Sequence, residues 1–396
     1  MSRHLTFGMG VTLKQIFLSM LAGTLVGLQP EAHAGPTNLV LRGSWPEPSS
    51  ASAVAVAVAG HYAYVANGIG GLAILDVGDP AHPVRVGGYP TPTYAHGVYA
   101  LSHYVYLADE SGMFILDVTD PTQPAPVGSL DPRISFRTAQ ALGDLLYLAA
   151  ANLKILNVSN PASPVLVVDL DIMGNALDLQ IVGDSIYFAG DLWWSVYNIT
   201  DPIRPAWVSI RQMAPFVNGI AVNNHHAYVA EQTTLHVFDV QDQAHPVAVD
   251  NQTLNGRIAD LEVVENTLFV AHAEGGVSVF DLSDPARPVR TTGYDTGFPE
   301  DLLVVGNYVL VANGYGGLVI LESQPLRLPA LTIMGNDTNA VLRWPASALG
   351  FLLESCSDLN TSNWFPIPTP PEVEGEVFSL SRAARGNEYF RLHRRN

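Results

Sequence analysis

One phrase of about 41 residues recurs along most of this chain. It consists of an apolar strand that ends in Asp, Asn or Glu, followed in most copies by a short turn that closes on Pro. The residues that end this strand are 40 to 42 apart: Asp76, Asp117, Asn157, Asn198, Asp239, Asp281 and Glu322. A period of this length, built only from short strands, is typical of a β-propeller.

Each repeat contains four runs with strand character. In the second repeat these runs are residues 97–101, 104–108, 113–117 and 126–130, all rich in β-branched or aromatic residues and bounded by Gly, Asp or Pro. Four such runs predict one four-stranded antiparallel blade. Seven copies of the first three runs therefore predict an all-β fold with a seven-bladed propeller.

The fourth run is missing from the seventh repeat. A run of the same character lies at the other end of the repeat region, at residues 38–45. If this N-terminal strand completes the last blade, the array closes into a ring and has no open sheet edge. We therefore expect the propeller to span residues 35–324.

The N-terminal residues have the features of a secretory signal. Arg3 and Lys14 are basic, residues 16–28 are apolar, and residues 32–34 (Ala-His-Ala) fit a small-x-small cleavage site. We expect a signal peptide over residues 1–34, no transmembrane span after cleavage, and a bacterial protein that is secreted, extracellular or associated with the cell envelope. An uncleaved anchor is the alternative. The single cysteine, Cys356, excludes an internal disulfide.

The charge of the chain is acidic and unevenly distributed. The formal net charge is −18, whereas the segment from Arg327 onward contains seven arginines and seven acidic residues. The acidic excess therefore lies in the repeats. Such a surface repels nucleic acid and anionic lipid, so we expect neither as a partner.

The last part of the chain differs from the repeats. Residues 325–330 form a Pro-containing linker, and strand-like runs follow at residues 331–333, 340–344, 350–355, 377–380 and 388–392. Several short strands with turn signals between them predict a small β-sandwich over residues 331–396.

The repeat resembles that of the LVIVD-repeat family of secreted bacterial and archaeal proteins. The resemblance rests on residues 71–77 (GLAILDV), residues 317–321 (GLVIL), the Asp-Pro-x-x-Pro-Val phrase at residues 79–84 and 284–289, and Tyr-Val-Ala-Asn at residues 64–67. It implies an exported β-propeller and no particular enzymatic activity. The C-terminal segment is similar to a short module of secreted verrucomicrobial and planctomycete proteins, through residues 342–345, 352–355, 357–359, 364 and 389–392.

The Asp-x-x-Asp-Pro turns are the most visible polar motif. They occur once per blade, so their carboxylates would lie far apart around the ring. An Asp oxygen that accepts amide N–H groups in the turn, beside a Pro that fixes φ, is a sufficient structural cause for the motif. We therefore interpret these turns as structural.

A candidate site emerges when the repeats are aligned at the start of the innermost strand. The aligned pairs are 54/55, 96/97, 137/138, 177/178, 218/219, 259/260 and 300/301, and all of them except the first contribute polar groups to the mouth of the channel. We expect a ligand site formed by His96, Arg137, Asp178, Asn218, Asp260, Glu300 and Asp301. The alternative is a water-filled channel lined by polar residues. Loops between the second and third strands add Asp109, Glu110, Asp191, Trp193, Glu231, His272, Glu274 and Tyr315 to the same face.

The leading functional hypothesis is a non-enzymatic extracellular or cell-surface binding or scaffold protein. Its partner would be an extracellular protein, a glycan or a small ligand. The second hypothesis is a secreted hydrolase or lyase that uses the carboxylates at the channel mouth with His96 and Arg137, and the third is a purely structural envelope protein. Familiar nucleophile, zinc and dinucleotide motifs are absent from the sequence, so we expect no catalytic residue, metal site or cofactor.

Overall fold

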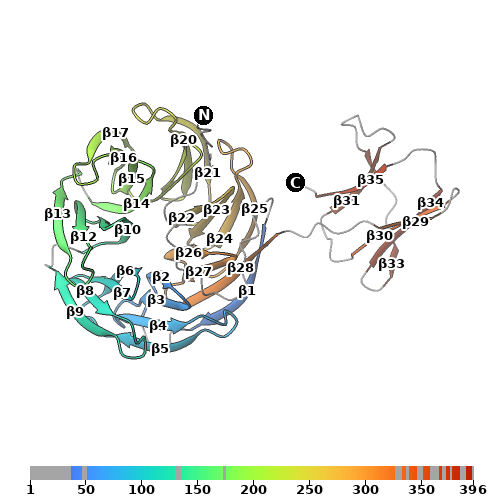
Figure 1. Cartoon of the computed structure of the whole chain (residues 1–396). Coiled ribbons are helices and arrows are strands. Elements are labelled where there is room, and N and C mark those ends of the chain that lie inside the picture. Colours follow the sequence, from blue (N-terminus) through green and yellow to red (C-terminus); the bar gives the residue numbers. More distant parts are fainter. Residues whose placement is uncertain are drawn as a thin grey trace, which may run out of the picture. The chain divides into compact units, whose positions relative to one another are not determined.

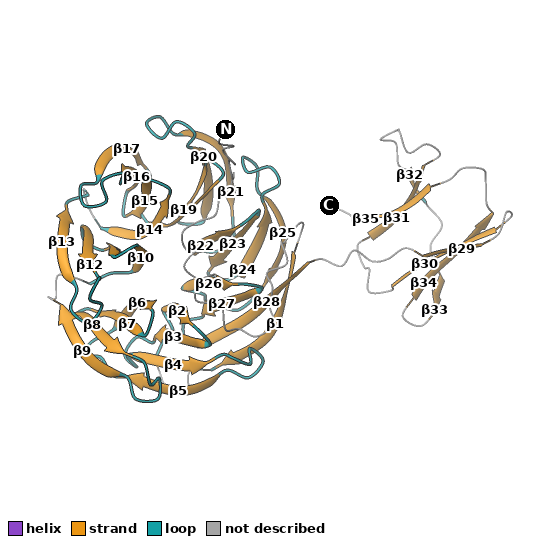
Figure 2. Ribbon diagram, viewed as in Figure 1, coloured by secondary structure: helices purple, strands orange, loops and turns teal. Residues whose placement is uncertain are grey.

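The repeats form a closed seven-bladed propeller in a computed structural model (Figure 1). The structure describes residues 37–46, 51–130, 135–172, 175–325, 332–335, 339–345, 351–356, 365–367, 372–374, 377–383 and 389–394. The predicted signal peptide at residues 1–34 lies outside the described residues. The described residues are strands and loops without a helix (Figure 2). Among them there is accordingly no helix long and apolar enough to cross a membrane.

Six blades follow one another along the chain, each an antiparallel sheet whose strands are ordered from the channel outward. The first two blades are β2 (Ala55–Ala59), β3 (Tyr62–Ala66), β4 (Leu72–Asp76) and β5 (Val84–Tyr89), then β6 (Ala95–Leu101), β7 (Tyr104–Asp109), β8 (Gly112–Asp117) and β9 (Ala125–Leu130). The third and fourth are β10 (Thr138–Leu142), β11 (Leu145–Ala149), β12 (Leu153–Asn157) and β13 (Val165–Leu170), then β14 (Ala176–Val182), β15 (Ser185–Gly190), β16 (Trp193–Asn198) and β17 (Ala206–Gln212). The fifth and sixth are β18 (Val217–Asn223), β19 (His226–Glu231), β20 (Thr234–Asp239) and β21 (Val247–Thr253), then β22 (Ile258–Val264), β23 (Thr267–His272), β24 (Gly276–Asp281) and β25 (Val289–Tyr294).

The seventh blade combines both ends of the propeller. It contains β26 (Asp301–Val305), β27 (Tyr308–Ala312) and β28 (Leu318–Pro325), and its outermost strand is β1 (Thr37–Trp45). Strand β1 pairs antiparallel with β28 from Thr37 opposite Pro325 to Trp45 opposite Leu318. The predicted closure by the N-terminal strand is therefore confirmed.

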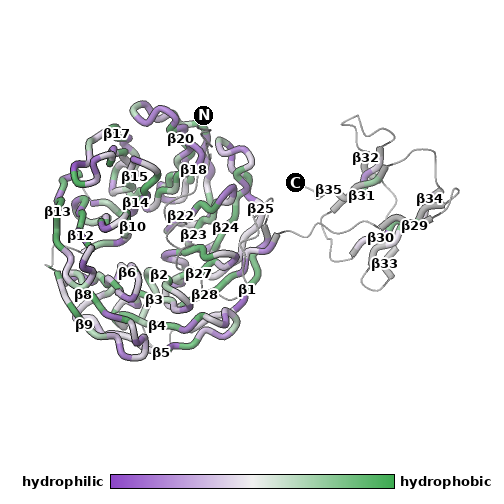
Figure 3. Tube along the Cα trace, viewed as in Figure 1, coloured by the Kyte–Doolittle hydropathy of each residue, from purple (hydrophilic) through white to green (hydrophobic). Residues whose placement is uncertain are grey.

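The core of the propeller lies between the blades. Each pair of neighbouring blades shares one buried apolar cluster, as between blades one and two, where Ile74 and Leu72 pack with Val105 and Leu107. The seven clusters follow the ring. Hydrophobic residues follow the strands inside the ring, and hydrophilic residues are frequent in its outer turns (Figure 3). Because each sheet buries both faces, its strands read as nearly continuous apolar runs.

The Asp-x-x-Asp-Pro turns are structural, as predicted. In the first blade Asp76 Oδ1 accepts the N–H of Gly78 at 2.9 Å, and Asp79 Oδ1 accepts the N–H of Ala81 at 3.1 Å. The same pair of bonds recurs in the copies that begin at Asp117, Asn198, Asp239 and Asp281, and Asn157 accepts the first of these bonds in its copy. These residues end the third strand and cap the turn that leads to the fourth.

The same turns also join neighbouring blades. Tyr106, Tyr147 and Tyr228 occupy one position of the second strand, and their hydroxyl groups donate to the carbonyl oxygens of Pro161, Pro202 and Pro285 in the next blade at 3.2, 3.0 and 2.9 Å. Where the turn has Gln243 instead of Pro, the Gln243 amide donates to the hydroxyl of Tyr187 at 2.9 Å. The Pro carbonyl is thus an acceptor between blades as well as part of a turn.

The chain divides into two compact units, residues 1–325 and residues 326–396. One sheet of the second unit contains β29 (Thr332–Gly335), β30 (Asn339–Pro345), β34 (Val377–Ala383) and β33 (Glu372–Glu374), and the other contains β32 (Phe365–Pro366), β31 (Phe351–Cys356) and β35 (Tyr389–Arg394). Leu342 and Leu380 of the first sheet share an apolar cluster with Leu353 of the second. The predicted sandwich stays a prediction for this unit.

Candidate functional site

Loops from neighbouring blades meet on one face of the propeller. Gly68, between β3 and β4, forms a bridge with Ala95 at the start of the second blade, and Gly314, between β27 and β28, forms one with Ala53 before the first blade. We call the face with these loops and the connections into the inner strands the loop face. The predicted channel mouth lies on it.

The residues predicted for the mouth occupy equivalent positions, as the alignment of the repeats required. His96 and Asn218 are the extra residues of β-bulges at the start of β6 and β18. Arg137 and Glu300 directly precede β10 and β26, and their backbone N–H groups donate to Ala149 and Ala312 at 3.0 and 2.8 Å. A bulge at the end of a strand changes the direction of one side chain. Neighbouring side chains at the start of β6 and β18 therefore point in different directions.

The side chains of His96 and Asn218 form hydrogen bonds near the mouth. His96 Nε2 lies 3.0 Å from the hydroxyl of Ser135, and that hydroxyl donates to the backbone oxygen of Asp109. Burial lowers the pKa of His96, and the charge of Arg137 lowers it further. The Asn218 amide donates to the Ile258 carbonyl at 2.9 Å.

Glu300 forms an ion pair with the guanidinium of Arg257 at 3.0 Å, and both side chains are substantially exposed. An exposed pair of this kind contributes little to stability. Its charges therefore remain available to a ligand at the loop face.

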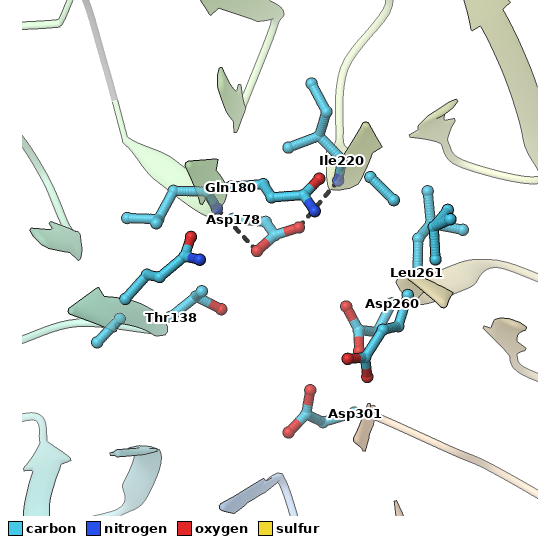
Figure 4. A pocket seen from close by; sticks show the side chains of 13 residues that line it. Thr138, Asp178, Gln180, Ile220, Asp260, Leu261 and Asp301 are labelled. Carbon is cyan, nitrogen blue, oxygen red and sulfur yellow. Dashed lines mark hydrogen bonds between the residues drawn. The ribbon is translucent and has the colours of Figure 1, made fainter. Parts of the chain in front are cut away.

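The three predicted aspartates lie deeper and come together. Asp178, Asp260 and Asp301 line one cavity of about 50 Å³ in the channel, and Figure 4 shows their carboxyl groups turned toward its middle from three blades. Neither His96 nor Arg137 is among the described residues that line this cavity. The two side chains that the hydrolase hypothesis combined with the carboxylates are thus not part of the described wall of this cavity.

Each of the three aspartates also joins its blade to the next. Asp178 Oδ2 accepts the N–H of Ile220 at 2.9 Å, and Asp260 Oδ2 accepts that of Leu302 at 3.1 Å. Asp301 Oδ2 accepts the N–H of Val56 at 2.8 Å, across the closure of the ring. The innermost strand of a blade is an edge strand, so the N–H groups on its unpaired edge need acceptors from outside the sheet.

A second row of acceptors lies two residues further along the innermost strands, on β10, β14 and β22. The side chains of Gln140, Gln180 and Glu262 line the same cavity and accept the N–H groups of Ile181, Val222 and Val304 in the following blades. The sequence analysis missed these three residues. The period of two along a strand places them on the same face as the aspartates, and this signal was available in the alignment of the repeats.

The polar residues that end the second strands have a shared structural task. Asp109 accepts the N–H of Thr93 at 3.0 Å, Glu231 accepts that of Ala214, and His272 Nδ1 lies 2.7 Å from the carbonyl oxygen of Asn255. In each case the partner is 16 or 17 residues earlier, in the connection that enters the blade. Different residue types therefore anchor the same connection in different blades.

Four apolar side chains are exposed on the loop face near blades seven, one and two. Tyr315 is 79% exposed, Ile69 66%, Phe298 63% and Tyr94 36%. Ile69 and Tyr315 occupy the same place in the two Asn-Gly-x-Gly-Gly loops, residues 67–71 and 313–317. We call these four residues the apolar platform.

The backbone connects the members of the platform. The ring of Tyr94 lies against Gly68, beside Ile69, and the carbonyl oxygen of Phe298 lies close to Gly314, beside Tyr315. The bridge from Gly314 to Ala53 then leads to Ser52, whose carbonyl lies close to Gly68. Gly68 and Gly314 both have positive φ, at 51° and 54°, which favours Gly in these tight loops.

Comparisons with known proteins agree with the architecture. The model of the LVIVD repeat matches residues 50–91, 92–131, 139–171, 217–253, 255–296 and 297–322, more than half of the chain. None of the proteins of curated function matches the sequence.

Among solved structures, similar folds have low sequence identity. The WD40 domain of Pan2 from Neurospora crassa is 12% identical with a TM-score of 0.58, over 76% of this chain and 99% of that one. Sqt1 from Saccharomyces cerevisiae is 10% identical with a TM-score of 0.54, over 74% and 100%. At such identities the likeness shows the propeller fold alone.

Proposed function

This chain belongs to the LVIVD repeat family, and we propose that it is a non-enzymatic extracellular or cell-surface binding protein that engages its partner with the loop face. A propeller with these repeats fits a binding or scaffold role in general. The finer proposal is that the apolar platform and the exposed charges at the channel mouth form one contact surface for a protein or a glycan.

The observation that carries the proposal is the apolar platform. Large side chains such as Tyr315 and Phe298 lie more than half exposed in loops, and neither belongs to the described apolar clusters between the blades. Exposed apolar groups that gather in one place are typical of interaction sites, and aromatic residues dominate the energetics of such sites. Loops on a rigid scaffold are also where binding residues concentrate.

The rim of the propeller offers a contrast. Its outermost strands also expose apolar residues, including Val84, Val165, Val247 and Val289, but these occupy one position that recurs from blade to blade. The Asn-Gly-x-Gly-Gly loops occur in blades seven and one only. A partner that contacts one side of the ring needs such a local feature.

Next to the platform, the channel mouth supplies charge of both signs. Arg137 and Glu300 are exposed, and His96 is half-buried beside Ala95, which pairs with the Gly68 loop. These groups would orient a partner whose apolar part rests on the platform. The C-terminal unit, similar to modules of secreted verrucomicrobial and planctomycete proteins, would serve surface association.

Selection of ligands on the purified chain tests the proposal. The chain is probed with a glycan array and with a displayed peptide library, and the ligands found are then titrated against the double variant Phe298→Ser/Tyr315→Ser. We expect the double variant to lose at least about tenfold in affinity, because truncation of a central aromatic contact typically costs 2 kcal/mol or more.

A matched variant on the rim controls for the loss of apolar surface. Val165→Ser/Val289→Ser removes two side chains that are each 61% exposed, and it should bind as the original chain does. Ligands that lose affinity for the rim variant but not for the Phe298/Tyr315 variant would overturn the proposal.

A further inference from the structure

A second pair of exposed apolar side chains lies on the loop face, where blades four and five meet. Leu192 is 48% exposed and Phe216 is 60% exposed. In the alignment of the repeats they take the places of the four platform residues: position 216 corresponds to 94 and 298, and position 192 corresponds to 69 and 315. We call Leu192 and Phe216 the second contact.

The backbone holds Phe216 in a conformation that a bulky residue rarely adopts. Its φ is 72°, in the left-handed region. Its N–H donates to the carbonyl oxygen of Asp191 at 2.7 Å, and its own carbonyl oxygen accepts the N–H of Gln232 at 3.1 Å. Such a conformation persists only where the surroundings fix it, and it is frequent in segments that hold ligands. The exposed ring is therefore held in place before a partner binds, which lowers the entropic cost of binding.

Hydrogen bonds also join the two members of the second contact. Beside the bond from Phe216 to Asp191, the carbonyl oxygen of Leu192 accepts the N–H of Met213 at 2.8 Å. From blade five, the side-chain amide of Gln232 donates to the carbonyl oxygen of Pro215 at 3.1 Å. The second contact is therefore anchored to the blades on both of its sides.

The second contact lies across the channel from the apolar platform. The platform is centred on blade one, and in a ring of seven blades the border between blades four and five is the part farthest from blade one. Figure 1 shows β4 and β5 on the opposite side of the ring from β20 and β21. A partner that rests on both contacts must therefore reach across the channel mouth, which requires an extended shape.

The loops that surround the channel mouth carry mainly negative charge. The described residues in the loops between second and third strands, and in the connections into the inner strands, include six acidic and two basic side chains: Glu110, Asp171, Asp191, Glu274, Asp295, Glu300, Arg137 and Arg257. Glu300 and Arg257 pair with each other at 3.0 Å. The remaining acidic groups favour a partner of opposite charge. Peptides supply positive charge through Lys and Arg, whereas glycans rarely do.

We propose that the partner of the loop face is an extended cationic peptide segment that lies across the channel mouth. One apolar side chain of the segment rests on the platform and another on the second contact, and Lys or Arg side chains between them face the acidic loops. This inference rests on the function proposed for the loop face and adds the chemical class and the path of the partner. Two linked contacts bind more tightly than either alone, because the second one forms within the complex.

Selection of a displayed library of unstructured linear peptides, without bias in charge, on the purified full chain tests the proposal. The peptides recovered are synthesised and titrated by calorimetry. We expect them to carry net positive charge and to bind more weakly as the salt concentration rises, because salt screens exposed charges. Leu192→Ser/Phe216→Asn should raise their Kd at least about tenfold, as Phe298→Ser/Tyr315→Ser should.

The choice of Asn at position 216 separates binding from folding. Asn adopts a left-handed backbone conformation more readily than Phe, so the Tm of Phe216→Asn should not fall below that of the original chain. If the double variant with Leu192→Ser does not fold, Phe216→Asn alone replaces it, with the same direction of change in Kd.

A matched variant in the same blade controls for the loss of apolar surface. Ile203→Ser/Trp207→Ser removes two side chains that are 50% and 61% exposed, in the outer turn and on the outermost strand of blade four. This variant should bind the peptides as the original chain does.

The charge of the loop face has its own pair of variants. Glu110→Gln/Glu274→Gln removes two exposed acidic groups from the loops and should raise the Kd at least about threefold at low salt, since exposed charge pairs are individually weak. Asp144→Asn/Asp184→Asn removes two exposed acidic groups from the turns between first and second strands and should leave the Kd unchanged.

The outcomes distinguish this inference from the function on which it rests. Peptides that lose affinity for the Phe298/Tyr315 variant, but not for the Leu192/Phe216 variant, would support the loop face and overturn the path across the channel. Glycan ligands without any peptide ligand, or peptides with net negative charge, would overturn the chemical class. Equal weakening by the Ile203/Trp207 variant would overturn the inference as a whole.

Discussion

At the scale of single residues, the side chains of the propeller fall into two groups. Some are buried and bond to backbone groups, and others are exposed to solvent. Asp178 and Asp109 are buried, and both accept N–H groups of backbone that would otherwise lack an acceptor. Tyr315 and Arg137 are exposed and serve no such need. A difference between repeats is therefore not enough to indicate function; exposure decides which differences are candidates for binding.

Asp178 offers a direct test of the bonds between inner strands. We expect Asp178→Ala to lower the free energy of unfolding by about 1–3 kcal/mol, because the N–H of Ile220 is left buried without an acceptor. Asp178→Asn keeps an acceptor oxygen and should cost clearly less. Urea denaturation of both variants measures the difference, and an equal loss in the two would contradict the assigned role.

The buried side chain of His272 is expected to make the stability of the propeller depend on pH. Burial lowers the pKa of this side chain below the ordinary value of 6.5. The unfolded chain then binds the proton more readily than the folded one, so stability is fully present above pH 6.5 and falls as the pH decreases from there toward the lowered pKa. The same sign applies to His96.

The measurement is the Tm of His272→Gln at a series of pH values between 7 and 5. We expect a smaller loss of Tm on acidification than in the original chain. His61→Gln, at an exposed turn, is the matched control and should retain the full loss. A variant at position 272 with an unchanged pH profile would show that His272 does not contribute.

At the scale of elements, the sequence predicted the strands well and the contacts between blades poorly. The repeated apolar runs and the Asp-x-x-Asp-Pro turns predicted the four strands of each blade, because local patterns determine both. The bond from Tyr228 to the carbonyl of Pro285 was not predicted, since it joins residues 57 apart. A backbone carbonyl that acts as an acceptor also cannot be recognised from a pattern of side chains.

The candidate site divides in the same way. Alignment of the repeats placed His96, Arg137 and Asp260 correctly at the start of the inner strands. It did not separate the rim of the mouth from the deeper cavity, because that distinction depends on the bulges and on the direction of each side chain. The apolar platform was missed except for Tyr315, since isolated apolar residues in loops carry no pattern.

The contact between Tyr228 and Pro285 can be measured by removal of a single hydroxyl group. We expect Tyr228→Phe to lower the free energy of unfolding by about 0.5–1.5 kcal/mol, the usual net value of one hydrogen bond. Tyr62→Phe, in a second strand where no such bond to a turn is described, is the comparison. Equal stabilities of Tyr228→Phe and the original chain would show that this hydrogen bond does not contribute to the stability of the propeller.

At the scale of the whole molecule, closure by β1 is what makes the array a ring. Leu39 is 4% exposed and packs in the cluster between blades six and seven, whereas Leu41 on the same strand is 44% exposed. We expect Leu39→Ala to cost about 2–4 kcal/mol and Leu41→Ala less than about 1 kcal/mol. Chemical denaturation that gave similar losses for both would mean that β1 is not firmly packed in the seventh blade.

The central claim is that the loop face contacts the partner while the interior of the ring is scaffold. Replacement of Tyr315 by the photo-crosslinking amino acid p-benzoylphenylalanine, in the cells that produce the protein, tests it most directly. The same replacement at Val165 on the rim is the reference, because both positions are well exposed. The account predicts a discrete covalent adduct from position 315 and none from position 165. Adducts from position 165 alone, or from neither position, would contradict it.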